Sequence, residues 1–126
     1  TEAVDIPDHT LIAVYNQHLV IGVAIMDPES MYLAHFMVRP GWEQGGLGKR
    51  MLSALITNAP RSRDITLHCS VTNPAMLLYN QFGFKPEQFV SNHYCRYYRL
   101  AKESKECRSM VAGYSPHAFL MRLKRR

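Results

Sequence analysis

Cysteines are few in this sequence, and no two of them lie close together. Cys69, Cys95 and Cys107 are odd in number and far apart, and none belongs to the C-x-x-C pair that holds zinc or forms a redox couple. We therefore expect three reduced thiols and no metal site. Long apolar runs are absent as well. No stretch approaches the roughly 20 residues that cross a bilayer, and residues 1–8 lack the basic and then apolar order of a signal peptide. These absences favour a soluble, intracellular protein without membrane contact.

The length of 126 residues and the hydrophobic content of 47% fit a single domain, residues 1–126, with one core. Positive charge is concentrated near the end of the chain. From Arg96 onward there are nine Lys or Arg and two Glu, a net charge of +7, whereas six basic and eight acidic residues before it give −2. Such a segment fits contact with nucleic acid or an acidic partner as well as it fits a solvated face. Direct nucleic-acid binding therefore stays open.

Three apolar segments at the start of the chain predict three strands. Residues 11–15 and 19–26 are aliphatic and β-branched and flank a short polar turn, so they predict a β-hairpin. Residues 31–38 are nearly all apolar and predict a third strand that is covered on both faces.

Two strand–loop–helix units follow from this third strand onward. The stretch Gly45-Gly46-Leu47-Gly48 leads into a segment whose apolar residues recur at helical spacing as far as Asn58. Residues 65–71 predict the next strand, and Asn73 as N-cap with Pro74 at the first helical position predicts a second helix that ends near Gly83. This order favours a parallel pairing of the two strands with helices on the sheet. Two last strands are expected at residues 84–90 and 117–123.

A glycine loop between a strand and a helix presents backbone N–H groups at the positive end of the helix dipole, where phosphate oxygens bind. Glycine suits this place because a Cβ would hold the backbone away from the ligand. The stretch matches neither G-x-x-x-x-G-K-[ST] nor G-x-G-x-x-G. A nucleotide P-loop and a Rossmann site are therefore disfavoured, and the loop alone predicts either a phosphate site or a tight turn.

Two longer segments resemble the Gcn5-related N-acetyltransferases (GNAT). Residues 38–52, VRPGWEQGGLGKRML, resemble the family's acetyl-CoA-binding motif, [RQ]-x-x-G-x-[GA] after a strand. Residues 73–84, NPAMLLYNQFGF, resemble its second motif, in which Asn is followed by Tyr and then by Gly-Phe. Both occur in the family's order and at its usual separation, a combination more specific than either motif. The resemblance implies an α/β GNAT fold: a mixed central sheet, flanked by helices, with a parallel pair at the acetyl-CoA site.

The resemblance also implies an acetyl-CoA-dependent N-acetyltransferase and a role for individual residues. In the family, the strand before the loop binds the pantetheine arm, here at Met37 and Val38. Tyr79 stands where the family's general acid protonates the departing CoA thiolate, and Asn73 would cap its helix near the cofactor. Without the resemblance, Tyr79 fits a core tyrosine with a satisfied hydroxyl. The amides that would hold the pyrophosphate belong to Gln44, Gly45, Gly46, Leu47, Gly48 and Lys49.

Two departures from the family pattern concern the chemistry. Glu43 stands where the acetyl-CoA motif has Arg or Gln, and a carboxylate there repels a pyrophosphate. Either Glu43 points into solvent or Gln44 takes its place. The Gcn5 branch often uses a glutamate on the strand before the loop as general base, and residues 31–38 contain none. A water chain is one alternative base, and the nearby candidate side chains are Asp27, Glu29 and His35.

Further segments resemble one branch of the family, the acetyltransferase subunit of a chromatin complex. They are residues 67–79, 94–98 and 117–126. This resemblance implies a nuclear protein that acetylates a lysine of a histone tail beside other subunits of a chromatin-modifying complex. The tyrosine-rich residues 94–98 would lie near the substrate or form a solvent-facing loop. The chain would then be the C-terminal piece of a longer protein, truncated at its start, because the family's first strand and paired helices have no room before Leu11. The alternative function is a structural module that binds acetyl-CoA and transfers little.

Overall fold

The computed structural model describes residues 2–6, 9–90 and 117–125. Residues 94–98, which we expected either near the substrate or in a solvent-facing loop, lie outside the described residues, as do Cys95, Cys107 and most of the basic segment. The chain forms two compact units, Thr1–Leu67 with Leu123–Arg126 and His68–Arg122.

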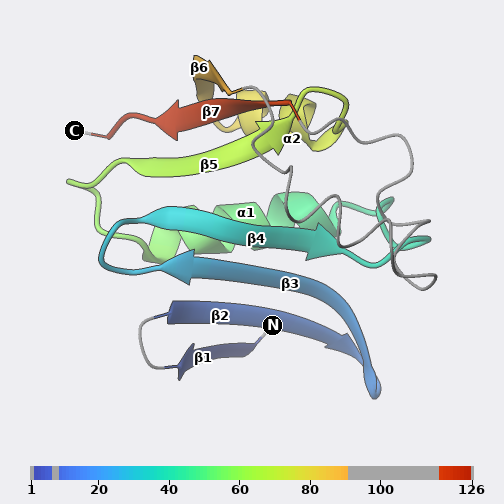
Figure 1. The fold of residues 1–126 in the computed structure, drawn as a ribbon. Helices are drawn as coiled ribbons and strands as arrows, with labels where there is room; N and C mark the ends of the chain where they lie inside the picture. Colours follow the sequence, from blue (N-terminus) through green and yellow to red (C-terminus); the bar gives the residue numbers. More distant parts are fainter. Residues whose placement is uncertain (1, 7–8, 91–116, 126) are drawn as a thin grey trace, which may run out of the picture. The chain divides into compact units, whose positions relative to one another are not determined.

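Four strands, each antiparallel to the one before it, begin the first unit (Figure 1). They are β1 Glu2–Ile6, β2 His9–Asn16, β3 Leu19–Asp27 and β4 Tyr32–Val38. The hairpin of β2 and β3 confirms the prediction from residues 11–26. β1 corrects the expectation that no strand fits before Leu11. Five extended residues are enough to pair their backbone with the edge of β2, from Glu2↔Ala13 to Ile6↔His9.

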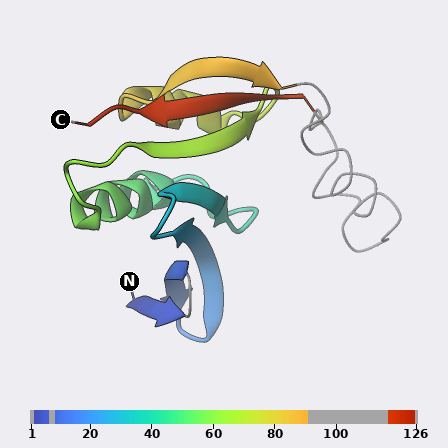
Figure 2. The same ribbon diagram turned by 60° about the vertical axis from the view of Figure 1, so that its left-hand side comes forward.

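The helix α1, Leu47–Asn58, covers one face of this sheet (Figures 1 and 2). Gly22 of β3 allows the helix to approach closely, because a Cβ on that residue would stand 2.6 Å from the Sδ of Met51. The packing of α1 on the sheet therefore sets the distance between the end of β4 and the start of α1, which the glycine loop connects. The buried side chains of α1 follow the predicted helical spacing and are Leu47, Met51, Leu52 and Leu55.

The strand β5, Ile65–Ser70, runs parallel to β4. Its register, Tyr32↔Thr66 and Leu33↔Leu67, lies at the first two residues of β4. The N–H of Thr66 also donates to the carbonyl of Met31 at 3.1 Å. The strand order in the first unit is β1-β2-β3-β4-β5, so the predicted mixed sheet with a parallel pair is confirmed.

β4 is more exposed than its apolar sequence led us to expect. Leu33 is buried, but Ala34 and His35 are exposed, and Met37 is 46% exposed. The expectation of cover on both faces was wrong. Of the helices described in this unit, α1 alone lies on the sheet, and it covers one face.

The turn between β3 and β4 is held from two sides. Within it, the N–H of Met31 donates to the carbonyl of Asp27 at 2.8 Å, and the N–H of Glu29 donates to Asp27 Oδ1 at 2.9 Å. From the loop after α1, the guanidinium of Arg63 donates to the carbonyl oxygens of Pro28 and Glu29. Met31 has φ 59° and a side chain that is 2% exposed. The turn is therefore tight, and the apolar side chain of Met31 belongs to the core.

The second unit contains the end of β5, then α2 Ala75–Gln81, β6 Lys85–Val90 and β7 Ala118–Leu123, with the strand order β5-β7-β6 (Figure 2). Arg122 of β7 donates to the carboxylate of Glu87 on β6 at 2.6 Å. These elements match the predicted ones to within two residues at each end. In the described residues, no helix combines the length and the apolar character that a membrane crossing needs. Among the described residues of this unit, the buried side chains are Cys69, Ser70, Tyr79, Phe84, Ala118 and Met121.

Candidate functional site

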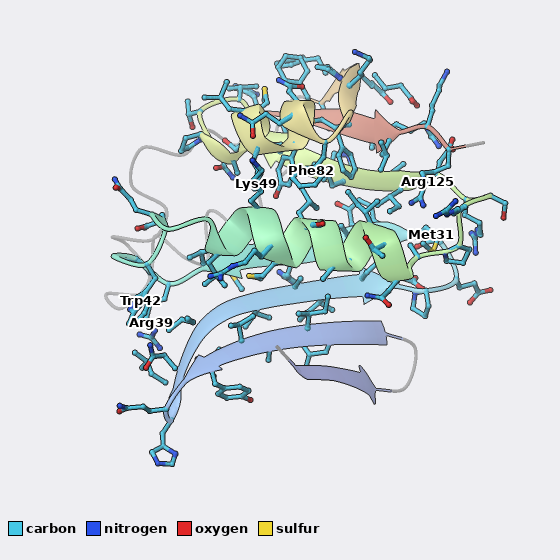
Figure 3. All side chains as sticks on the ribbon, turned by 180° about the vertical axis from the view of Figure 1, so that it is seen from behind. Met31, Arg39, Trp42, Lys49, Phe82 and Arg125 are labelled. Carbon is cyan, nitrogen blue, oxygen red and sulfur yellow. The ribbon has the colours of Figure 1, made fainter. Side chains whose placement is uncertain are left out.

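The chain turns sharply where β4 ends. In this β-turn, residues 39–42, the N–H of Trp42 donates to the carbonyl of Arg39 at 2.9 Å. Pro40 presets the second position, and Gly41, with φ 90°, takes the left-handed conformation that the third position of a type II turn requires. The Nε of Arg39 also donates to the carbonyl of Val20 at 2.8 Å, which ties the turn to the β2–β3 hairpin. Figure 3 shows Arg39 and Trp42 together at this end of the first unit.

The glycine loop after this turn has the backbone of an anion site. Gly45 and Gly46 have φ 100° and 80°, and apart from the adjoining residues a Cβ at either position would meet no atom of the described residues within 4 Å. Gly46 is the N-cap of α1, and within the described part of the chain no side chain caps this helix. The first turn also contains no acidic residue. The amides at such a helix start have no acceptor within the helix, and the helix dipole adds positive potential beside them.

The structure brings the predicted pyrophosphate residues together in one loop. The loop before α1 contains Gln44, Gly45 and Gly46. The first turn of α1 contains Leu47, Gly48 and Lys49. Lys49 is exposed and lies at the N-terminal end of α1 (Figure 3). Met37 and Val38, predicted for the pantetheine arm, are the last residues of β4 and directly precede the turn. Their roles toward a ligand stay predictions.

Glu43 makes a contact that the sequence did not reveal. Its Oε2 accepts the N–H of Gly41 at 2.9 Å, so the carboxylate is exposed but bonded to the turn. We had expected either a side chain in solvent or replacement by Gln44. One feature of the sequence could have predicted this bond. Glu43 follows Gly41 by two residues, and the turn places Gly41 in a left-handed conformation.

The second unit carries Asn73 and Tyr79. Asn73 Oδ1 accepts the N–H of Ala75 at 2.9 Å, so this side chain is bonded to the start of α2. The prediction that Asn73 is the N-cap residue was wrong by one position. The helix itself begins later than expected, with Pro74 as its N-cap residue. Tyr79 is 5% exposed, and its ring meets Phe84 edge to face at 5.9 Å between centroids. Tyr79 is thus a packed core residue of its unit, and its catalytic role stays a prediction.

The three candidate bases occupy different places in the first unit. Asp27 ends β3 and Glu29 lies in the turn that precedes β4, where the Asp27 carboxylate accepts the Glu29 N–H at 2.9 Å. That turn lies at the opposite end of β4 from the glycine loop, about 20 Å away for a seven-residue strand. His35 is exposed near the middle of β4. His35 is therefore the candidate nearest to the loop.

Metal and thiol chemistry find no support in the described residues. Among them, no three His, Cys, Asp or Glu side chains gather closely enough to hold a metal ion. Cys69 is a free thiol that is 1% exposed, and burial raises its pKa to about 11. The thiol is therefore protonated at neutral pH and inert as a nucleophile.

A strand that ends in a type II turn, a left-handed glycine loop and an uncapped helix start define an α/β domain whose loop has the backbone geometry of an anion site. Residues 7–86 match the family described as acetyltransferase (GNAT) domain. The match covers more than half of the chain and includes the glycine loop and α2. The chain belongs to this family.

Two relatives extend the likeness to the whole chain. The proteins named cysteine-rich protein 2-binding protein of Mus musculus and of Homo sapiens are each 36% identical to it over 129 aligned residues, 99% of this chain. The chain spans 15% of the length of each relative. The closer resemblance that residues 67–79 and 117–126 indicated was to this protein, and the match confirms it.

Solved structures share the fold. A Bacillus subtilis acetyltransferase in complex with CoA gives a TM-score of 0.68 at 14% identity, over 94% of this chain and 78% of that chain. A GNAT family acetyltransferase from Elizabethkingia anophelis with acetyl-CoA bound gives 0.66 at 13% identity, over 94% and 77%. An Arabidopsis thaliana protein in complex with the bisubstrate analogue CoA-Ac-MVNAL gives 0.62 at 16% identity, over 92% and 72%. These similarities confirm the predicted GNAT fold.

Proposed function

We propose that this chain is an acetyl-CoA-dependent N-acetyltransferase. The observation that carries the proposal is the glycine loop at the start of α1, in a chain that belongs to the GNAT family. Gly45 and Gly46 have a positive φ, and among the described residues beyond their chain neighbours no atom lies within 4 Å of the place of a Cβ. The space beside the loop therefore suits a ligand. Uncapped amides and a first turn without acid fit the charge of a pyrophosphate.

On this proposal, each group of site residues has its own role. The amides of residues 44–49 bind the pyrophosphate, and the backbone at Met37 and Val38 binds the pantetheine arm. The thioester of acetyl-CoA supplies the acetyl group that is transferred. Tyr79 holds a proton on its phenolic oxygen and donates it to the sulfur that leaves when the amine attacks. Its burial and its packing on Phe84 support this role, because they fix the ring in one orientation.

The substrate that we propose is a lysine of a histone tail. The resemblance to the chromatin branch supports it, together with relatives that are 36% identical over nearly the whole chain. The structure of a similar fold with an analogue that joins CoA to a peptide also supports a protein substrate. On this proposal the chain is one domain of a longer nuclear protein, and its partners are the other subunits of a chromatin-modifying complex.

Acetyl transfer to intact core histones tests the proposal. The chain is incubated with acetyl-CoA and histones, CoA release is followed, and acetylated lysines are mapped by mass spectrometry. We expect transfer by the wild type and a loss of about 10²-fold or more in kcat for Tyr79→Phe, with acetyl-CoA affinity unchanged. Tyr15→Phe is the matched control, because Tyr15 is a tyrosine of β2 that is 52% exposed.

The outcomes separate the candidate roles. Equal turnover by Tyr79→Phe would remove the general acid from Tyr79 and leave the transferase. Acetyl-CoA binding without acetylation of any histone, even beside the partner subunits, would favour the structural module. The absence of a glutamate on β4 is the observation that keeps this second function under test.

A further inference from the structure

We propose that Glu43 is a positioning residue of the acetyl-CoA site, whose carboxylate holds the turn before the glycine loop and whose charge weakens the grip on CoA. The inference rests on the proposed function and concerns the same site. It starts from a departure: a carboxylate stands where the family motif has Arg or Gln. The structure shows what that carboxylate does within the protein, because its Oε2 accepts the Gly41 N–H at 2.9 Å.

The bond closes a short ring of chain at the entrance to the loop. Gly41 has φ 90°, and the neighbouring Trp42 N–H already donates to the carbonyl of Arg39 at 2.9 Å. With the bond to Glu43, both amides after Pro40 have an acceptor, so the turn is fixed in its left-handed form. The residues that follow start from this turn and must reach the helix N-cap at Gly46. Holding the turn therefore positions the amides that bind phosphate.

The charge acts in the opposite direction. Glu43 is exposed and lies three residues before Gly46, so its carboxylate stands on the loop that receives a doubly charged pyrophosphate. Repulsion through solvent weakens binding of acetyl-CoA and CoA alike and is reduced by salt. Because product and co-substrate carry the same pyrophosphate, weaker binding also speeds the release of CoA after transfer.

Two substitutions separate the hydrogen bond from the charge. Glu43→Gln keeps an acceptor oxygen in place and removes the charge, whereas Glu43→Ala removes both. Comparison of the wild type with Gln isolates the charge, and comparison of Gln with Ala, which have equal charge, isolates the bond to Gly41. Ser62→Lys is the control for net charge. It changes the total by the same +1, and Ser62 is exposed in the loop after α1, away from the glycine loop.

Trp42 provides the readout, because it is the only tryptophan of the chain and lies next to Glu43. Its fluorescence is titrated with CoA and with acetyl-CoA at low salt and at about 1 M salt, where the Debye length is near 3 Å. We expect Glu43→Gln to bind both ligands about three- to tenfold more tightly at low salt, with the gain lost at high salt. We expect Glu43→Ala to bind about three- to tenfold more weakly than Glu43→Gln at both salt concentrations, as the loss of one loop hydrogen bond implies.

Steady-state kinetics give the second readout. Relative to Glu43→Gln, Glu43→Ala should raise the KM for acetyl-CoA without lowering kcat, a split that a general loss of stability does not produce. Equal affinities of the wild type, Gln and Ala variants would overturn the inference while leaving the proposed function intact. Failure of the wild-type chain to bind either ligand, by fluorescence and by calorimetry, would overturn the proposed function and this inference with it.

Discussion

The sulfur of Met51 on α1 lies 2.6 Å from the point at which a Cβ of residue 22 would stand on β3, so Gly22 and Met51 together set the distance between helix and sheet. Met51 is 1% exposed, which leaves its side chain little room to move aside. The contact lies one helical turn after the glycine loop. The packing of α1 on β3 thereby determines where the amides at the start of α1 stand, which are the amides proposed to bind phosphate.

Gly22→Ala should therefore destabilise the chain by overpacking, by about 1–3 kcal/mol in chemical denaturation. In a Met51→Ala background the clash is gone, and the same substitution should cost less by about 1 kcal/mol or more. The double-mutant cycle measures this difference directly. Additive costs of the two substitutions would show that the helix does not rest on residue 22 as the geometry indicates.

Gly46 and Gly48 are expected to respond to alanine with opposite signs of stability. Gly46 is the N-cap with φ 80°, so Gly46→Ala should cost about 1 kcal/mol through backbone strain alone. Gly48 belongs to the first turn of α1, where alanine is the better helix former. Gly48→Ala should therefore raise the free energy of unfolding by about 0.5–1 kcal/mol. Thermal unfolding measures both effects.

Both substitutions should nevertheless weaken acetyl-CoA binding, because each puts a methyl group on the backbone that would approach the pyrophosphate. We expect a loss of roughly tenfold for each, as for one or two amide–phosphate hydrogen bonds. Unchanged affinity in the more stable Gly48→Ala variant would argue against the proposed binding mode, since no loss of folding could mask the result.

At Met31 the backbone conformation favours glycine, whereas the burial of the side chain favours a large apolar residue. Its φ of 59° favours glycine, but its side chain is 2% exposed and belongs to the core. Met31→Ala should cost about 2–5 kcal/mol by leaving a cavity. Met31→Gly loses the same side chain but relieves about 1 kcal/mol of strain, so it should be no less stable than Met31→Ala. Leu33, a buried strand residue of β4, is the control, and there the glycine variant should be less stable than the alanine variant. If the glycine variant is the less stable one at Met31 as well, the backbone strain at Met31 is contradicted.

Local patterns explain why much of the first unit could be predicted. The hairpin of β2 and β3 followed from two apolar runs around a polar turn, and α1 followed from helical spacing after the glycines. The parallel pair followed from the order of elements, since two strand–loop–helix units in succession restrict the topology. The exposure of β4 was not predictable, because an apolar run looks the same whether one or two faces of a strand are covered.

Contacts between distant residues escaped prediction for a different reason. The guanidinium of Arg63 reaches the carbonyls of Pro28 and Glu29, which lie 35 and 34 residues away in sequence. Backbone carbonyls leave no mark in a sequence, so such a bond appears only when the turn and the loop are folded. The bond from Gly41 to Glu43 spans two residues but depends on a side-chain rotamer, which the sequence does not specify. Motif resemblance located the candidate site. The bond from Gly41 to Glu43 supplies local support there, whereas the Arg63 contacts hold the turn at the other end of β4.

Cys69 predicts a loss of stability at alkaline pH. Burial raises the pKa of its thiol from 9.0 to about 11. Below pH 9 the thiol is protonated in both states and adds no pH dependence. Between about pH 9 and 11 the unfolded chain releases this proton while the folded chain keeps it, so the free energy of unfolding falls, by at most about 3 kcal/mol. Cys69→Ala should remove this part of the slope, and denaturation curves of both proteins across that range isolate it from the titration of lysines and tyrosines. Parallel curves for the two proteins would mean that the thiol is not buried in a proton-retaining form.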